Sequence, residues 1–185
     1  MNLRRVAFDH PDAGRLNDHV QREYAERFES DGDVTVLEPA MFEPPQGLYL
    51  IVYDDLGAPV ATGGWRSQDE NEEVYADGDA EIKRMYVVPQ ARRRGLARLV
   101  LAALEEDARA AGRTRMVLET GAKLPEAISL YLSSGYAPCA KVGPYRFHKE
   151  SRCYAKPLTP ASASPSSTSS TSSTTAASGP EAMTR

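Results

Sequence analysis

Three arginines and a glycine stand together where the chain is expected to pass from a strand to a helix, in the segment RRRGLA at residues 92–97. The N-terminus of a helix offers backbone N–H groups that lack a partner and carry partial positive charge, so it attracts anions. Gly95 allows the main chain to approach an anion closely, and the small side chain of Ala97 leaves space at the first turn of the helix. The segment therefore predicts a site for a diphosphate, to which the arginines add positive charge.

Other interpretations of this segment stay open at this point. It lacks the GKS or GKT ending of the phosphate loop of nucleotide hydrolases, and it does not match GxGxxG. The pattern R-x-x-G-x-A is short enough to occur by chance, so the arginines could form a solvated basic turn or contact the phosphates of a nucleic acid. The net charge of −4 and the absence of interleaved aromatic residues speak against a nucleic-acid surface.

The elements around this segment are expected to alternate between strand and helix. Residues 80–88 are typical of a strand, and residues 96–111 of a helix that ends at Gly112. Residues 115–119 predict a second strand and residues 125–134 a second helix. The phosphate segment thus lies in the turn between the first strand and the first helix of this region.

The rest of the chain predicts further strands and one more helix. Residues 12–28 repeat an apolar side chain every four positions, which gives the single stripe of an amphipathic helix. Residues 48–53 and 60–65 are β-rich runs separated by turn residues, so they predict a hairpin. Residues 3–8 and 152–156 predict the first and last strands. The fold class that follows is a mixed α/β domain.

With these elements in place, the chain resembles the GNAT superfamily of N-acetyltransferases. The acetyl-CoA motif of that family is Q/R-x-x-G-x-G/A between a strand and a helix, and Arg92, Gly95 and Ala97 match it in place. Downstream, residues 127–136 (AISLYLSSGY) resemble the family element A-x-x-L-Y-x-x-x-G-Y/F. The two motifs follow in the expected order, and the resemblance is strongest over residues 81–136.

The resemblance implies a mostly antiparallel central sheet flanked by helices, with fourth and fifth strands that splay apart around the pantetheine arm. It also implies acetyl-CoA as a co-substrate and no metal. The residues that would contact acetyl-CoA, through main-chain groups in the strand and in the loop, are Met85, Tyr86, Val87, Val88, Arg92, Arg93, Arg94, Gly95, Leu96, Ala97 and Arg98. The chain departs from the family at Leu124, where many members have an Asn that contacts CoA.

Acetyl transfer to an amine requires a group that takes the proton of the amine and one that assists the departing thiolate. Glu81 is the candidate base, and a strand places Lys83 on the same face, so a plain ion pair between the two is an equal alternative. Tyr131 is the candidate acid, because in the family pattern this tyrosine points at the CoA sulfur; packing under the sheet is the alternative. Tyr136 is expected in the core, and His148 in a surface loop.

The expected function is the transfer of acetyl from acetyl-CoA to a primary amine of a small molecule or peptide, by direct attack in a ternary complex. The alternative is a non-catalytic acyl-CoA-binding sensor module, which would bind CoA without turnover. By the resemblance, the acceptor pocket would involve the first helix, the loop after it and residues 143–146. Glu81 and the acidic loop at residues 69–73 would suit a cationic amine. A homodimer is an expectation from the family alone.

The composition of the chain limits the other classes of protein to which it can belong. With 185 residues, of which 41% are hydrophobic, the chain is long enough for one packed domain. No apolar run could span a bilayer, and the N-terminus lacks the apolar stretch of a secretory signal, so we expect a cytoplasmic protein with no membrane partner. Cys139 and Cys153 form no CxxC pair, which makes a zinc site improbable. Residues 1–158 are expected to form the acetyltransferase domain, and residues 159–185 a disordered tail rich in Ser, Thr and Ala.

Removal of residues 160–185 is expected to leave the melting temperature and the affinity for acetyl-CoA unchanged. The segment holds no Leu, Ile, Val or aromatic residue that could join a core. Thermal melts and calorimetric titrations of the full-length and truncated proteins check this. A melting temperature lowered by more than about 4 °C in the truncated protein, which is roughly 1 kcal/mol or more at this chain length, would contradict the prediction.

Overall fold

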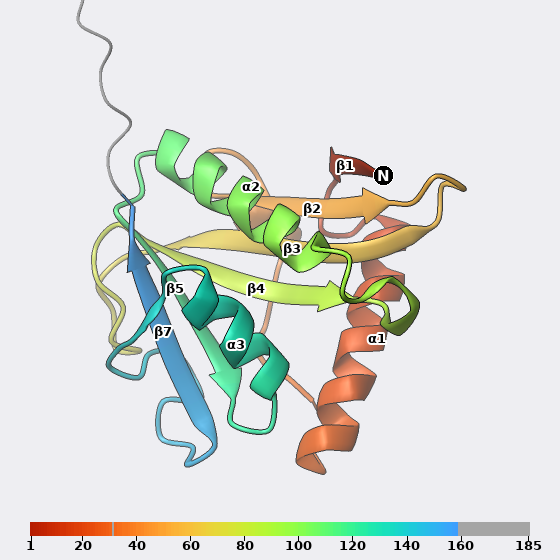
Figure 1. Ribbon diagram of the computed structural model, residues 1–185. Helices are drawn as coiled ribbons and strands as arrows, with labels where there is room; N and C mark the ends of the chain where they lie inside the picture. Colours follow the sequence, from red (N-terminus) through yellow and green to blue (C-terminus); the bar gives the residue numbers. More distant parts are fainter. Residues whose placement is uncertain (31, 159–185) are drawn as a thin grey trace, which may run out of the picture.

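The computed structural model describes residues 1–30 and 32–158, and in them a sheet of seven strands is flanked by three α-helices. The order of the strands across the sheet is β1-β2-β3-β4-β5-β7-β6 (Figure 1). Their bounds are β1 (Asn2–Arg5), β2 (Gly47–Tyr53), β3 (Pro59–Gln68), β4 (Asp79–Val87), β5 (Arg115–Gly121), β6 (Ala137–Pro138) and β7 (Ser151–Pro157). Neighbouring strands are antiparallel, except that β4 and β5 are parallel. This confirms the predicted fold class; the predicted tail at residues 159–185 lies outside the described residues.

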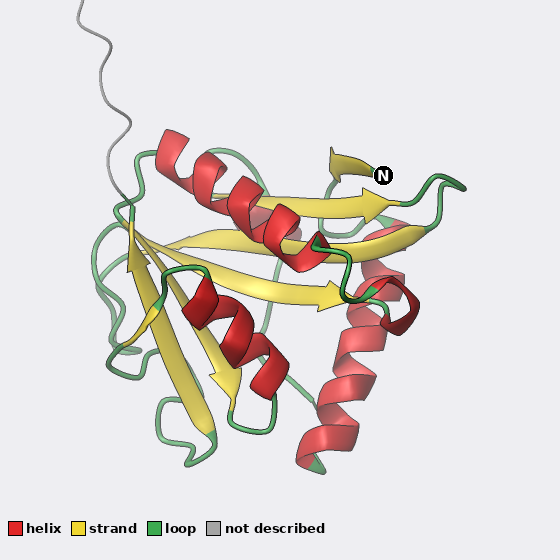
Figure 2. Cartoon of the chain, in the orientation of Figure 1, coloured by secondary structure: helices red, strands yellow, loops and turns green. Residues whose placement is uncertain are grey.

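The α-helices cover both faces of the sheet. They are α1 (Pro11–Phe28), α2 (Leu96–Ala110) and α3 (Pro125–Ser133), and two short 3₁₀ helices, η1 (Pro39–Phe42) and η2 (Pro89–Ala91), lie in the loops. Figure 2 shows α2 and α3 in front of the sheet and α1 behind it. None of the helices in the described residues is long and apolar enough to cross a membrane.

Two apolar layers fix these helices on the sheet. On one face, α2 buries Val100 and Leu104 completely, in a cluster that also contains Trp65. On the other face, α1 buries Leu16 in a cluster with Tyr49. Burying a side chain of this size stabilises the fold by about 1.5–3 kcal/mol, so the helix ends that surround the site are held by a packed core.

The parallel strands β4 and β5 pair only at their beginnings. The ladder joins three residue pairs and ends at Glu81 and Val117, after which the two strands diverge (Figure 1). On its other edge, β4 pairs Lys83 with Gly64 and Tyr86 with Thr62, so β4 has one more residue than β3 over this interval, which is a β-bulge.

Arg84 lies in this bulge with a φ of 57°, in the left-handed region. Its side chain is nearly buried, and its Nη1 lies 2.9 Å from Asp33 Oδ2, in the segment after α1. The bulge bends β4 away from β5, and the ion pair holds the bend against the neighbouring segment. The predicted splay of the fourth and fifth strands is therefore present, and it leaves an opening in the sheet.

Three element boundaries differ from the sequence-based expectations. The first strand ends at Arg5 rather than residue 8, because Phe8 turns inward and stacks on Phe42 with a ring separation of 4.5 Å. Strand β5 continues past Glu119 to Gly121, because it pairs with β7 along that whole length. Where a further strand beginning at Tyr136 is expected from the sequence, the chain forms the two-residue strand β6.

Candidate functional site

The loop before α2 has the geometry of an anion site. Gly95 caps the helix with a φ of 79°, and no side chain caps the helix end. The first hydrogen bond of the helix is donated by the Leu99 amide to the Gly95 carbonyl at 3.0 Å. The amides of residues 96–98 therefore precede the helical ladder and face outward. A Cβ built on Gly95 meets no atom within 4 Å, so the space in front of these amides is open.

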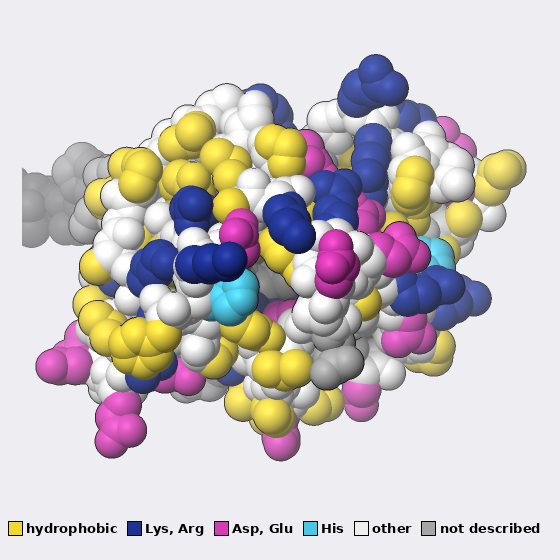
Figure 3. All heavy atoms as spheres, turned by 90° about the horizontal axis from the view of Figure 1, so that it is seen from below, with side chains coloured by type: hydrophobic (Ala, Val, Ile, Leu, Met, Phe, Trp, Pro, Cys, Tyr) yellow, Lys and Arg dark blue, Asp and Glu magenta, His cyan; other side chains and the backbone are white. Residues whose placement is uncertain are grey.

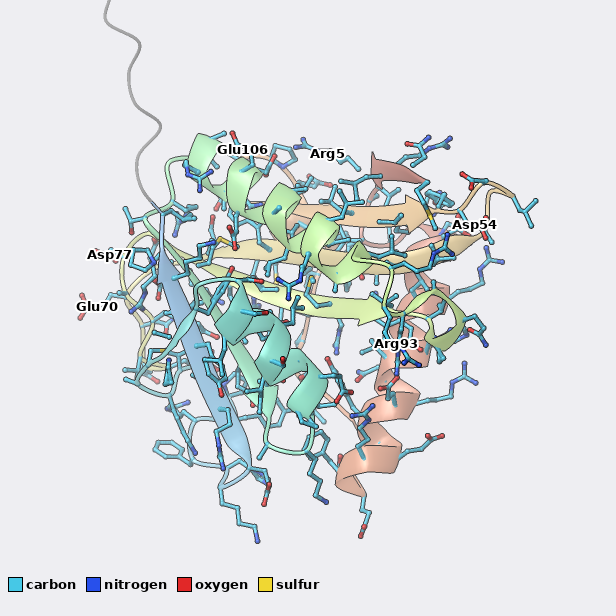
Figure 4. All side chains as sticks on the ribbon, viewed as in Figure 1. Arg5, Asp54, Glu70, Asp77, Arg93 and Glu106 are labelled. Carbon is cyan, nitrogen blue, oxygen red and sulfur yellow. The ribbon has the colours of Figure 1, made fainter. Side chains whose placement is uncertain are left out.

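The arginines of this loop divide into two kinds. The Arg92 guanidinium holds the loop in place: its Nη2 lies 2.5 Å from Glu23 Oε2 on α1, and its Nε donates to the Val87 carbonyl at 3.0 Å. Arg93 and Arg94 have exposed side chains that can reach a ligand in solution. Figure 4 shows Arg93 beside the loop, on the side where α1 lies.

A groove of about 850 Å³ leads from this loop toward the opening between β4 and β5. The sequence-predicted residues that line it are Met85, Tyr86, Val87, Arg92, Arg93, Gly95, Leu96, Ala97 and Arg98. Val88 and Arg94 lie outside the lining, and the Val88 amide already donates to the Val60 carbonyl at 3.0 Å. Ligand contacts by Val88 and Arg94 stay predictions.

A second cavity of about 350 Å³ lies beyond the opening and shares five lining residues with the groove. The shared residues are Tyr24, Met85, Leu124, Ala127 and Tyr131. They come from α1, β4 and the start of α3, so the opening in the sheet joins the groove to the cavity. Two molecules can thus reach one another from opposite sides, one lying in the groove and one in the cavity.

The model of the Acetyltransferase (GNAT) family matches residues 14–136, which is more than half of the chain. The chain belongs to the GNAT acetyltransferase family. The match includes the splayed strands, the phosphate loop and the motif around Tyr131.

Relatives and solved structures agree with this assignment. The uncharacterized N-acetyltransferase YjgM of Escherichia coli is 31% identical over 142 residues, which cover 72% of this chain and 80% of that protein. The IAA acetyltransferase of Azospirillum brasilense is 41% identical over 81 residues, and the match spans only 53% of that relative and 44% of this chain. A Klebsiella pneumoniae structure, provisionally assigned as an acyl-CoA N-acyltransferase, superimposes with a TM-score of 0.66 at 27% identity, covering 85% of this chain and 97% of that one.

Tyr131 lies where the groove that starts at the loop before α2 meets the second cavity. It is 5% exposed and packs edge-on against Tyr136 with a ring separation of 5.6 Å. The Tyr136 hydroxyl donates to Glu105 at 3.0 Å, whereas that of Tyr131 has no hydrogen-bond partner in the described part of the chain. Burial raises the pKa of Tyr131, so its phenol stays neutral and can donate a hydrogen bond. Tyr136 is a core residue, as predicted.

Glu81 lies in a buried polar network rather than in the cavity lining. Its Oε2 accepts from Arg66 Nε at 2.7 Å, and its Oε1 lies 2.8 Å from Lys83 Nζ and 2.7 Å from the Tyr75 hydroxyl. Burial alone would raise the pKa of Glu81, but Lys83 and Arg66 outweigh it and hold the pKa below its usual value. The expected pair with Lys83 is present, and it is buried rather than at the surface; the part of Glu81 as a base stays a prediction.

Glu119 is a carboxylate that the sequence reasoning missed. It lines the second cavity from β5, and burial raises its pKa to about 7, although Lys83 and the nearby Ser151 hydroxyl act in the opposite direction. A group with a pKa near neutrality in a cleft is suited to proton transfer. The sequence signal that could have indicated Glu119 was its position as a charged residue at the carboxyl end of an apolar strand.

The second cavity has the walls that the resemblance implies for the acceptor. Phe28 at the end of α1, Val34 in the following segment and Tyr145 line it. Figure 3 shows basic and acidic side chains gathered around a hollow on this side of the molecule. The acidic loop takes no part, since Glu70 lies at the opposite end of the sheet from Arg93 (Figure 4). His148, expected at the surface, is exposed and also lines the cavity.

Leu124, which departs from the family motif, does lie in the groove. It caps α3 without a side-chain hydrogen bond and is 7% exposed. The family asparagine would supply an amide here, whereas leucine supplies an apolar wall to both the groove and the cavity. Leu124 therefore offers no side-chain amide to a ligand in the groove.

Gly95→Glu is expected to lower the affinity for acetyl-CoA by more than about tenfold, measured by calorimetry. The new carboxylate would stand in front of the free amides at the start of α2 and repel a phosphate. Gly112→Glu is the matched control, because Gly112 also has a φ of 79° and an open Cβ direction but follows the other end of α2. Equal affinities of the two variants would contradict a phosphate site at Gly95.

Proposed function

We propose that this protein is an N-acetyltransferase that moves acetyl from acetyl-CoA to a primary amine of a small molecule or peptide by direct attack in a ternary complex. The observation that supports this most directly is the meeting of two cavities at Tyr131, through the opening between β4 and β5. A donor in the groove and an acceptor in the cavity would then present their reacting ends to each other.

The groove fits acetyl-CoA, because it offers free amides and exposed arginines at one end and unpaired strand edges at the other. The amides of residues 96–98 would bind the pyrophosphate, and main-chain groups of Met85 and Tyr86 the pantetheine and the acetyl carbonyl. Acetyl-CoA supplies a thioester, whose carbonyl carbon an amine can attack.

The proton balance can be met by two side chains that both line the second cavity, Glu119 and, at its junction with the groove, Tyr131. The nitrogen of the amine forms the new bond to carbon while the bond from carbon to sulfur breaks. The proton that the amine loses passes to Glu119, and the departing thiolate accepts a hydrogen bond from Tyr131. Glu81 is the alternative base; its contacts with Lys83 and Arg66 favour a positioning part instead.

A panel of primary amines with acetyl-CoA tests the proposal. Release of free thiol, together with mass spectrometry of the acceptor, reports the transfer. Acetylation of at least one amine well above the rate of acetyl-CoA hydrolysis is expected. Tight binding of CoA with no transfer to any amine would overturn the proposal and favour a sensor module.

Tyr131→Phe is expected to lower kcat by roughly 10²–10³-fold with little change in the affinity for acetyl-CoA, because a donor to developing charge acts in the transition state. Tyr136→Phe is the matched control, since it removes a neighbouring hydroxyl whose partner is Glu105. The control should lose stability and keep its kcat. A kcat of Tyr131→Phe within about twofold of the parent, where chemistry limits turnover, would remove Tyr131 from the mechanism.

The pH profile distinguishes the two carboxylates. If Glu119 accepts the proton, kcat/KM should rise as the pH increases through about 7, where its carboxyl ionises. Glu119→Gln should lower kcat/KM by roughly 10²–10⁴-fold and abolish this rise. Glu81 has a lowered pKa and stays ionised over this range, so with Glu81 as the base the profile follows only the ionisation of the amine and shows no separate step at about pH 7.

Glu81→Gln provides the comparison. It leaves Lys83 and Arg66 without their buried counter-charge, so we expect a stability loss of about 3–5 kcal/mol and a retained rise near pH 7. Loss of the rise in this variant, with an unchanged profile in Glu119→Gln, would assign the base to Glu81.

A further inference from the structure

The charges around the acceptor cavity have a pattern that limits which amines fit. Glu81 is a single carboxylate in contact with two cations, Arg66 and Lys83, and the side chains of all three are at most 10% exposed. The three side chains together therefore carry a net charge of +1. Of the three residues, only Lys83 lines the cavity, so the surplus charge faces the acceptor.

Apart from Glu81, no charged residue nearby forms an ion pair with Lys83 in the described part of the chain. Asp33 is already paired with Arg84 at 2.9 Å, and that pair is neutral. Glu119 also lines the cavity, yet within the described residues no ion pair joins it to Lys83. His148, Glu150 and the three tyrosines Tyr24, Tyr131 and Tyr145 complete the titratable lining. The cavity thus presents the Lys83 ammonium and two carboxylates, Glu119 and Glu150, and within the described residues no ion pair joins Lys83 to either of them.

The register of the strands explains this separation. Glu81 and Val117 form the last pair of the parallel ladder, so Lys83 and Glu119 follow it by two residues on the same face. Parallel neighbours in a ladder lie about 5 Å apart, and here the strands are already diverging. A small molecule can lie between the two side chains and contact both.

A buried hydroxyl also lacks a partner at this place. Ser151 is 2% exposed and lines the cavity, and its Oγ has no hydrogen-bond partner among the described residues. An unpaired buried hydroxyl costs about 1–3 kcal/mol, so such groups usually meet a ligand or water. Ser151 lies on the neighbouring strand, close enough to lower the pKa of Glu119, so a ligand group that lies against Glu119 is also within reach of this hydroxyl.

We propose that the acceptor is a free amino acid, whose carboxylate pairs with Lys83 while its amine lies against Glu119. This deepens the proposed function and rests on it. A zwitterion matches the separate cation and carboxylate, because its own carboxylate pairs with the Lys83 ammonium, whereas a simple alkylamine brings no group that could pair with Lys83. The cavity of about 350 Å³ is at the lower end of ligand sites, which suits a small molecule rather than a folded protein.

The test uses matched acceptors with the unmodified protein. The twenty common L-amino acids are screened with acetyl-CoA, and each that is acetylated is compared with its decarboxylated amine and its carboxamide. Since a hydrogen bond to a charged group contributes about 1.5–3 kcal/mol, we expect kcat/KM for the amino acid to exceed that for both analogues by roughly tenfold or more.

Two variants then locate the charge that recognises the carboxylate. Lys83→Met removes the ammonium and keeps most of the stem, and it should lower the preference for the amino acid over its decarboxylated amine by roughly tenfold or more. Lys149→Met is the control, because Lys149 is exposed and does not line the cavity, and it should keep the parental preference.

The outcomes separate the two proposals. Equal rates with the amino acid and its decarboxylated amine, or a preference that Lys83→Met leaves unchanged, would overturn the amino-acid assignment while acetyl transfer to amines stands. Binding of acetyl-CoA without transfer to any amine would overturn the proposed function and the assignment together. Should Lys83→Met not fold, the comparison of the three matched acceptors with the parent protein decides alone.

Discussion

The separation of β4 from β5 is the constraint on which the rest of the site depends. The ladder between them ends at Glu81, and a bulge at Arg84 turns β4 aside. A left-handed residue other than glycine costs on the order of 1–3 kcal/mol, which the buried contact of Arg84 with Asp33 can offset. In return, main-chain groups that would pair in a continuous sheet become available to a ligand with amide groups. The opening also joins the two cavities, so binding and transfer depend on the same break in the ladder.

The buried charges beside this opening fix the position of Lys83 more than they stabilise the fold. Burying an ion pair costs desolvation that its attraction barely repays, so the network around Glu81 is no evident source of stability. It does hold Lys83 at a fixed place on the cavity wall, with Arg66 and Tyr75 fixing Glu81 in turn. A preorganised charge of this kind selects a ligand without reorganising when the ligand arrives. The position of Lys83, on which the proposed fit of an amino acid rests, therefore depends in part on Arg66 in the neighbouring strand β3.

Local sequence patterns were sufficient to predict the helices and strands, but not the register in which the strands pair. The predicted boundaries of three features lie within a few residues of the observed ones, because each feature reflects a periodicity or a helix cap. They are the apolar stripe of α1, the hairpin of β2 and β3, and the glycine after α2. The loop of residues 92–95 and the start of α2 lie where the motif predicts them, and phosphate binding there stays a prediction. Glu119 was missed because only the pairing of β5 with β4 and β7 places it on the cavity face. Likewise, Lys83 was foreseen as a partner of Glu81, whereas Arg66 becomes its neighbour only through the register of β3 with β4.

One physical cause can provide both proton roles in the proposed reaction. Burial raises the pKa of Tyr131 and of Glu119, since a low dielectric disfavours each charged form. For a phenol, which is neutral at neutral pH in any case, the shift secures a permanent hydrogen-bond donor. For a carboxyl, the same shift moves ionisation to about pH 7 and makes the group a stronger base than an exposed glutamate. Donor and acceptor of protons thus differ by side-chain type, although both line the same cavity beside the opening in the sheet.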